Sequence, residues 1–153
     1  DEALAMLGDA SHDERELLSA LPYAVNEVVL HTDERLLPKR KAAWASWNYH
    51  IGQRGSAQAT VSYNMNILQQ LKAPVTFCVT LNDTARIDSS KVLGRYHYAH
   101  PQFSVAGFAA QRRWGDISGH NHTHFCGAYW FNGFHEDGVR SALRVVEALG
   151  ERW

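Results

Sequence analysis

The sequence predicts an α+β fold: a mostly antiparallel sheet of about five strands with flanking helices, followed by a C-terminal strand, turn and helix. Three observations lead to this prediction. Short runs rich in β-branched and aromatic residues are joined by brief connections, which favours antiparallel pairing. Helical patterns precede and follow these runs, and a glycine-rich turn separates the last apolar run from a long amphipathic pattern.

Two helices are expected at the N-terminus. Residues 1–7 have acids at the start of an apolar helical pattern, where the helix dipole favours negative charge. Residues 11–21 begin with Ser11 as a plausible cap and continue with three leucines at helical spacing. Because no initiator methionine precedes a helix that looks already under way, we expect the chain to have been cut from a longer one.

Strands are expected over 23–32, 42–51, 57–65, 74–81 and within 87–104, with a break over 52–56 and helices over 67–71 and 105–114. The second of these runs alternates, so an extended chain places Trp47 and Tyr49 on one face and Asn48 and His50 on the other. One of these faces is expected to be buried.

The composition limits the class of protein. With 153 residues and 45% hydrophobic content the chain is long enough for a core, and one domain is the default. A net charge of -1 gives no electrostatic reason to expect nucleic acid or an anionic membrane as partner. No apolar run approaches the ~18 residues that suggest a membrane span, so a soluble protein is expected. Cys78 and Cys126 form no spacing pattern, which favours a reducing, cytoplasmic setting.

Residues 125–149, FCGAYWFNGFHEDGVRSALRVVEAL, carry the most functional information. An apolar, strand-like run stops at Gly127, and a helix with acids in its first turn is expected to start near His135. The first N–H groups of a helix lack partners within it, and its dipole is positive at that end. The segment therefore predicts a binding position for an anionic or electron-rich ligand.

The order FCGAY before the turn and GFHEDGVRSAL after it resembles the C-terminal cofactor segment of FAD-dependent oxidoreductases of the flavin-containing amine oxidase class. It is similar to bacterial members described as predicted NAD/FAD-binding proteins, and the resemblance extends back through WASWNY to NEVVLHTDERLLP. It implies that residues 1–21 continue a missing N-terminal cofactor domain, that 22–114 form a substrate-side sheet and helix, and that 115–153 complete the FAD-binding α/β domain.

The same resemblance implies which residues contact FAD. The N–H of His135, or of a neighbour, would face a flavin carbonyl, and Phe134 would flank the ring on its substrate side. Gly127 would permit close approach to the ribityl or phosphate part, and Gly138 close helix packing. The implied cofactor-binding residues are Gly127, Ala128, Gly133, Phe134, His135, Glu136, Asp137, Gly138 and Val139.

Two departures show that this chain would hold only half of such a site. The glycine fingerprint GxGxxG is absent, and Ala128 and Tyr129 stand where the wider class commonly has an acid. The phosphate-binding half is therefore expected in a missing N-terminal dinucleotide-binding region, and this fragment is expected to be inactive alone. The implied reaction is hydride removal from a C–N or C–C bond of a small-molecule substrate.

A non-enzymatic or metal-binding α+β domain is the alternative. His120, His122 and His124 alternate, so a strand would place all three imidazoles on one face, where they suit zinc, copper or iron. A cupin-like site would also need a carboxylate nearby, and residues 123–134 offer none. In this interpretation the glycines only make turns, and the acids only cap a helix.

Overall fold

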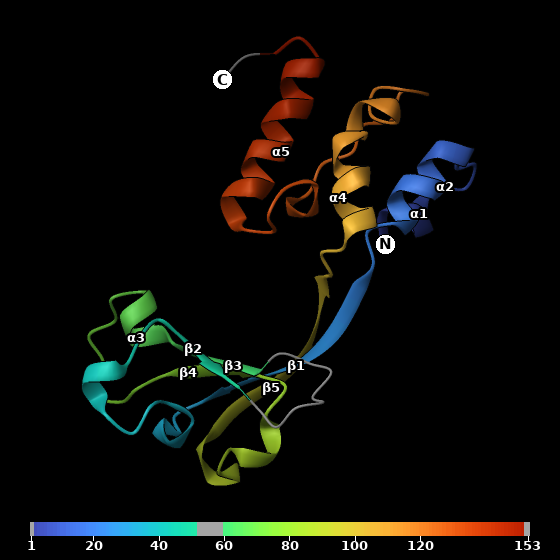
Figure 1. The fold of residues 1–153 in the computed structure, drawn as a ribbon. Helices are drawn as coiled ribbons and strands as arrows, with labels where there is room; N and C mark the ends of the chain where they lie inside the picture. Colours follow the sequence, from blue (N-terminus) through green and yellow to red (C-terminus); the bar gives the residue numbers. More distant parts are fainter. Residues whose placement is uncertain (1, 52–59, 152–153) are drawn as a thin grey trace. The chain divides into compact units, whose positions relative to one another are not determined.

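A computed structural model describes residues 2–51 and 60–151 and confirms the α+β fold (Figure 1). Its five-stranded sheet has the order β2-β3-β4-β1-β5, and β2 with β3, β3 with β4 and β4 with β1 pair antiparallel. The strands are β1 (Tyr23–His31), β2 (Trp47–His50), β3 (Thr60–Asn64), β4 (Cys78–Leu81) and β5 (Val92–Pro101). The expected break over 52–56 lies outside the described residues.

Five α-helices accompany the sheet: α1 (Glu2–Met6), α2 (His12–Ser19), α3 (Met65–Leu68), α4 (Val105–Arg112) and α5 (His135–Ala148). The chain divides into two compact units. The helical unit comprises residues 2–24 and 100–151, and the sheet unit comprises residues 25–99. Helix α4 belongs to the helical unit, whereas the sequence grouped it with the sheet in 22–114.

The expected cap of α2 is present. Glu14 N–H donates to Ser11 Oγ at 3.2 Å, and Ser11 N–H donates to Glu14 Oε2 at 2.6 Å, which forms a capping box. The leucines of this helix pack in the core of the helical unit, so cap and apolar stripe act together. The buried members of that core are Leu17, Leu18, Leu21, Ala110, Trp114, Ile117, Phe125 and Trp130.

In the sheet unit the buried face of the β2–β4 strands is polar. Asn48 is 7% exposed, whereas Trp47 and Tyr49 are 53% and 66% exposed. The register pairs Asn48 with Ser62 and Ser62 with Thr80, and both hydroxyl residues are fully buried. The alternation therefore predicted correctly which residues share a face, and the inward face carries hydrogen-bonding side chains.

The strand expected to end at Gly127 is not formed in the described part of the chain. Residues 124–127 have no strand assignment, and a 3-10 turn, η6 (Ala128–Trp130), follows at once. Side chains take the bonds that a neighbouring strand would otherwise take: Phe125 N–H donates to Ser118 Oγ, and Trp114 Nε1–H donates to the carbonyl of Phe125. Among the described residues, the helices are all too short or too polar to cross a membrane.

Candidate functional site: the turn before α5

Two glycines shape the turn that leads into α5. Gly127 has a φ of 150° and Gly133 a φ of 88°, a region that side chains other than glycine rarely adopt. A β-carbon at Gly133 would lie 3.2 Å from Cζ of Phe103, and one at Gly127 would collide with the ring of Tyr129. The backbone angles and the neighbouring rings therefore favour glycine at both positions, whether or not a ligand binds here.

Asp137 holds the turn against the start of α5. Its carboxylate is 8% exposed, and Oδ2 accepts the N–H groups of Asn132 at 3.2 Å and Phe134 at 3.1 Å. An acid at the third helical position that bonds back to the N-cap N–H is a standard way to close a helix start. Asp137 thus organises the turn, and its oxygen Oδ2 is occupied by the protein itself.

Three backbone donors remain at the start of α5. The N–H groups of His135, Glu136 and Asp137 have no acceptor within 2–51 and 60–151, whereas Gly138 N–H already bonds to the carbonyl of Phe134. They lie at the positive end of a 14-residue helix. The side chains around them are open to solvent: Phe134 is 55% exposed, and His135 and Glu136 are also exposed.

Gly127, Ala128 and Gly138, which were also predicted to contact FAD, make contacts within the protein. Gly127 N–H donates to Ser141 Oγ at 3.0 Å, so this donor is already used. The carbonyl of Ala128 accepts from Phe131 and Gly133, and a β-carbon on Gly138 would meet that of Ala128 at 3.9 Å. The sequence analysis did not predict this contact of Ser141, which is 1% exposed. Its spacing of four from Asp137, which places both residues on one helix face, is the signal that could have indicated it.

The histidine cluster does not form the expected strand face. His120 pairs with Thr123 across a tight turn, in which Asn121 and His122 have φ angles of 50° and 57°. Two left-handed residues in succession reverse the chain, so the alternation of residues 120–124 no longer follows a strand. The extended strand that would place the three imidazoles on one face is therefore not formed.

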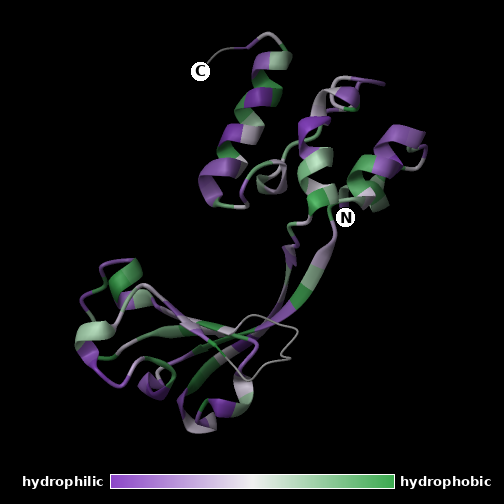
Figure 2. Ribbon diagram, in the orientation of Figure 1, coloured by the Kyte–Doolittle hydropathy of each residue, from purple (hydrophilic) through white to green (hydrophobic). Residues whose placement is uncertain are grey.

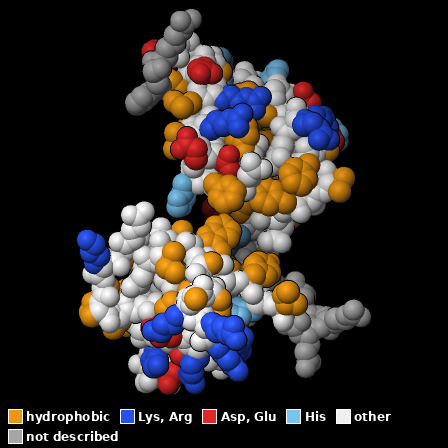
Figure 3. Space-filling view, turned by 60° about the vertical axis from the view of Figure 1, so that its left-hand side comes forward, with side chains coloured by type: hydrophobic (Ala, Val, Ile, Leu, Met, Phe, Trp, Pro, Cys, Tyr) orange, Lys and Arg blue, Asp and Glu red, His pale blue; other side chains and the backbone are white. Residues whose placement is uncertain are grey.

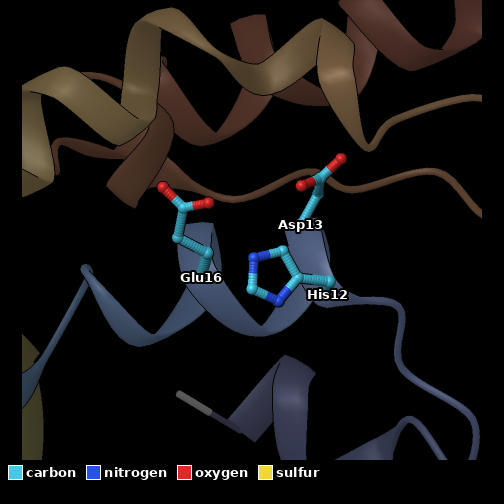
Figure 4. Close-up of side chains that lie close together, drawn as sticks. All are labelled: His12, Asp13 and Glu16. Carbon is cyan, nitrogen blue, oxygen red and sulfur yellow. The ribbon is translucent and has the colours of Figure 1, made fainter.

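A different trio of possible metal ligands comes together on α2. In the described ranges, ligand atoms of His12, Asp13 and Glu16 lie within 4.8 Å of one another (Figure 4). All three residues are exposed, and Glu16 already forms a 2.8 Å ion pair with Arg113. Neighbouring exposed groups on one short helix are common without a metal, so this trio supports no metal site.

Helix α5 also has an apolar side that nothing in the described part of its unit covers. Val139 is 53% exposed and Leu143, one turn later, is 36% exposed, while Leu149, which follows the last residue of the helix, is 62% exposed. Asp137 and Ser141, which are buried, mark the opposite, packed side of the helix. Hydrophilic and hydrophobic residues alternate along this helix (Figure 2), and apolar residues also occur on its exposed side.

Comparisons with known proteins do not assign this turn to a family. No protein-family model matches the chain, and no curated protein matches its sequence.

Proposed function

We propose that this chain is the C-terminal part of an FAD-dependent oxidoreductase similar to flavin-containing amine oxidases, and that the start of α5 contacts the flavin. The three free N–H groups of residues 135–137 carry the proposal. Bound FAD would supply the hydride acceptor. Negative charge gathers on the pyrimidine edge of a flavin when it is reduced, and N–H donors on a helix dipole stabilise that charge.

The donor set suits a carbonyl edge better than a phosphate. Glu136 and the buried carboxylate of Asp137 put negative charge into the first turn, which opposes the full charges of a phosphate more strongly than the delocalised charge of a flavin carbonyl edge. The exposed ring of Phe134 adds an apolar surface beside the donors. This agrees with the absence of a GxGxxG fingerprint, because the phosphate groups of FAD would be bound by another part of the protein.

The exposed apolar residues of α5 support a missing partner region. Val139 and Leu143 expose apolar surface one turn apart on the helix that would lie against the cofactor, and the exposed Leu149 follows its last residue. In the proposed enzyme the N-terminal dinucleotide-binding region covers these residues and completes the cofactor domain. The sheet unit then belongs to the substrate side, and a small-molecule substrate loses hydride from a C–N or C–C bond. We also propose a cytoplasmic location for the enzyme, and the free thiols of Cys78 and Cys126 support it.

The first experiment is purification of the longer polypeptide that contains this segment. We expect a yellow protein with flavin absorbance, whereas the 153-residue chain alone is colourless or binds FAD weakly. A colourless, metal-loaded longer protein would overturn the proposal and favour the metal-binding alternative.

A sharper test removes one donor without disturbing the helix. Proline fits the first helical position, where His135 lies, and it has no N–H. The backbone of Phe134, with φ -86° and ψ 163°, is already extended, as a residue before proline requires. His135→Pro in the longer protein is expected to lower the flavin reduction potential, whereas His135→Ala, which keeps the N–H, serves as the matched control. Equal potentials in the two variants would contradict flavin contact at this donor.

A further inference from the structure

A hydrogen-bond chain crosses four strands of the sheet unit. His31 Nε2 lies 2.8 Å from Thr80 Oγ1, which lies 2.7 Å from Ser62 Oγ. Ser62 Oγ in turn lies 3.2 Å from Nε2 of His50. The first three side chains are fully buried and His50 is half-buried, so the chain leads from the interior of the unit toward its surface.

One arrangement of the hydrogens gives both hydroxyl groups of this hydrogen-bond chain an acceptor within it. Asp33 N–H donates to His31 Nδ1 at 3.0 Å, so the neutral imidazole carries its hydrogen on Nε2 and donates to Thr80. Of the two directions open to the Thr80–Ser62 bond, only donation from Thr80 to Ser62 gives both hydroxyl hydrogens an acceptor among these four side chains. Ser62 in turn donates to Nε2 of His50. Neutral His50 therefore carries its hydrogen on Nδ1 and keeps that donor for another partner.

His50 lines a surface hollow of about 470 Å³ in the same unit. Three cationic residues, Arg35, Lys39 and Arg86, line it too, and its lining includes no aspartate or glutamate. Because β2 is an edge strand of the sheet, both of its faces border the hollow, and the exposed rings of Trp47 and Tyr49 contribute aromatic surface from the face opposite to His50. Figure 3 shows Lys and Arg side chains gathered on the sheet unit. The hollow thus combines cationic donors, an imidazole N–H and aromatic rings.

The cations retain donors that their present partners do not use. Arg35 binds Asp33 through Nε and Nη2, and Arg86 binds Asp83 through Nη1. Asp33 is fully buried behind Arg35, and Asp88 lies 3.8 Å from the same guanidinium. Lys91 Nζ lies 3.9 Å from Asp33, and Lys39 has no ion pair within the described residues. The four cations Arg35, Lys39, Arg86 and Lys91 therefore exceed the three carboxylates beside them by one positive charge.

We propose that this hollow binds an aromatic monocarboxylate, whose carboxylate accepts from the Nδ1–H of His50 and from Arg86 while its ring packs on Trp47 or Tyr49. One negative charge matches the net charge of the hollow, and a planar carboxylate matches the guanidinium fork. The hydrogen-bond chain is a positioning device that holds His50 in the donating tautomer. The site lies wholly in the sheet unit and does not depend on the flavin proposal.

The test uses the 153-residue chain and ¹⁵N NMR of its histidine rings at about pH 8, where an ordinary imidazole is neutral. Phenylacetate is the probe, and phenethylamine, which has the same ring with the opposite charge, is the control. Phenylacetate is expected to shift the His50 ring signals and the Arg86 side-chain signals, and phenethylamine to leave them unchanged. Equal shifts with inorganic phosphate would overturn the aromatic part of the proposal, and no shift with phenylacetate would overturn the site.

Variants separate positioning from folding. Thr80→Val keeps the shape of the side chain but removes the hydroxyl that links His31 to Ser62. His50 should therefore lose its single tautomer. It should also bind phenylacetate about fivefold more weakly, which is the loss expected for one hydrogen bond. Thr80→Ser restores the hydroxyl and should restore both properties. If Thr80→Val remains folded and keeps the tautomer and affinity of the parent chain, the positioning role is wrong. Arg86→Gln, at an exposed residue, tests the carboxylate contact without touching the buried chain, and an unchanged affinity would contradict that contact.

Discussion

The Nδ1 atom of His31 accepts a 3.0 Å hydrogen bond from the backbone N–H of Asp33, which leaves this buried imidazole one neutral tautomer. A proton on Nδ1 would point at that N–H and break the bond. Burial lowers the pKa of His31 below its ordinary value of 6.5, although the nearby carboxylate of Asp33 acts in the opposite direction. The folded chain therefore resists a proton that the unfolded chain accepts.

This resistance predicts the direction of a pH effect. Below about pH 6.5 the unfolded state binds a proton at His31 that the folded state does not, so the free energy of unfolding should fall as the pH falls through this range. Urea denaturation between about pH 5 and 8 measures it. His31→Gln should reduce the slope, whereas His12→Gln keeps the buried imidazole and should keep the slope. A free energy of unfolding that rises as the pH falls would contradict the lowered pKa of His31.

Asp33 is expected to stabilise the loop after β1. Bonds from Arg35 chiefly, and then from the N–H of Asp88, hold the pKa of Asp33 well below its usual range, although burial opposes this shift. The carboxylate therefore stabilises the fold above about pH 4 and loses this effect as the pH falls further.

Asp33→Asn should lower the free energy of unfolding by about 2–3 kcal/mol, toward the lower end for a broken buried pair because Arg35 is 63% exposed. Asp116→Asn, which breaks an exposed pair with Arg113, is the control, with an expected loss of less than about 1 kcal/mol. Equal losses of unfolding free energy in the two variants would show that the buried position of Asp33 does not strengthen its ion pair.

Local patterns predicted much of the fold. The cap at Ser11, the five strands and the helix at His135 follow from residues that are neighbours in sequence. The alternation of β2 also predicted that Asn48 and His50 share a face. Such features depend on backbone geometry within a few residues, which the sequence expresses directly.

The buried chain from His31 to His50 could not be predicted in the same way. It depends on the register of β4 between β1 and β3, which brings Thr80 opposite Ser62 over a separation of 18 residues. Polar residues in a strand usually indicate an exposed face, and only their long-range partners make burial favourable. The histidine alternation of 120–124 failed for the opposite reason, because two left-handed residues inside it interrupt the strand pattern.

The two thiols should differ in reactivity. Cys78 is fully buried, and burial raises the pKa of its thiol to about 12, whereas Cys126 is exposed. Since the thiolate is the reactive form, iodoacetamide should label Cys126 in the folded chain and Cys78 only after denaturation. Peptide mass spectrometry before and after denaturation measures this order. Labelling of Cys78 in the folded Cys126→Ser variant would contradict the burial of Cys78.

Gly133 offers a test of the turn with a closely matched control. Gly133 and Gly150 share a φ of 88°, but a β-carbon at Gly150 meets nothing within 4 Å, whereas one at Gly133 lies 3.2 Å from the ring of Phe103. Gly150→Ala should therefore cost about 1 kcal/mol, from the left-handed backbone alone. Gly133→Ala should cost more, because Phe103 must also move.

In the longer polypeptide the two variants should also separate stability from cofactor binding. Gly133→Ala distorts the turn that aims the N–H groups of α5, so the flavin content per protein should fall, and Gly133→Val should lower it further. Gly150→Ala strains the far end of the same helix and should leave flavin content unchanged. Equal flavin content in all three variants, measured by absorbance, would place the cofactor away from this turn and leave the glycine with a folding role alone.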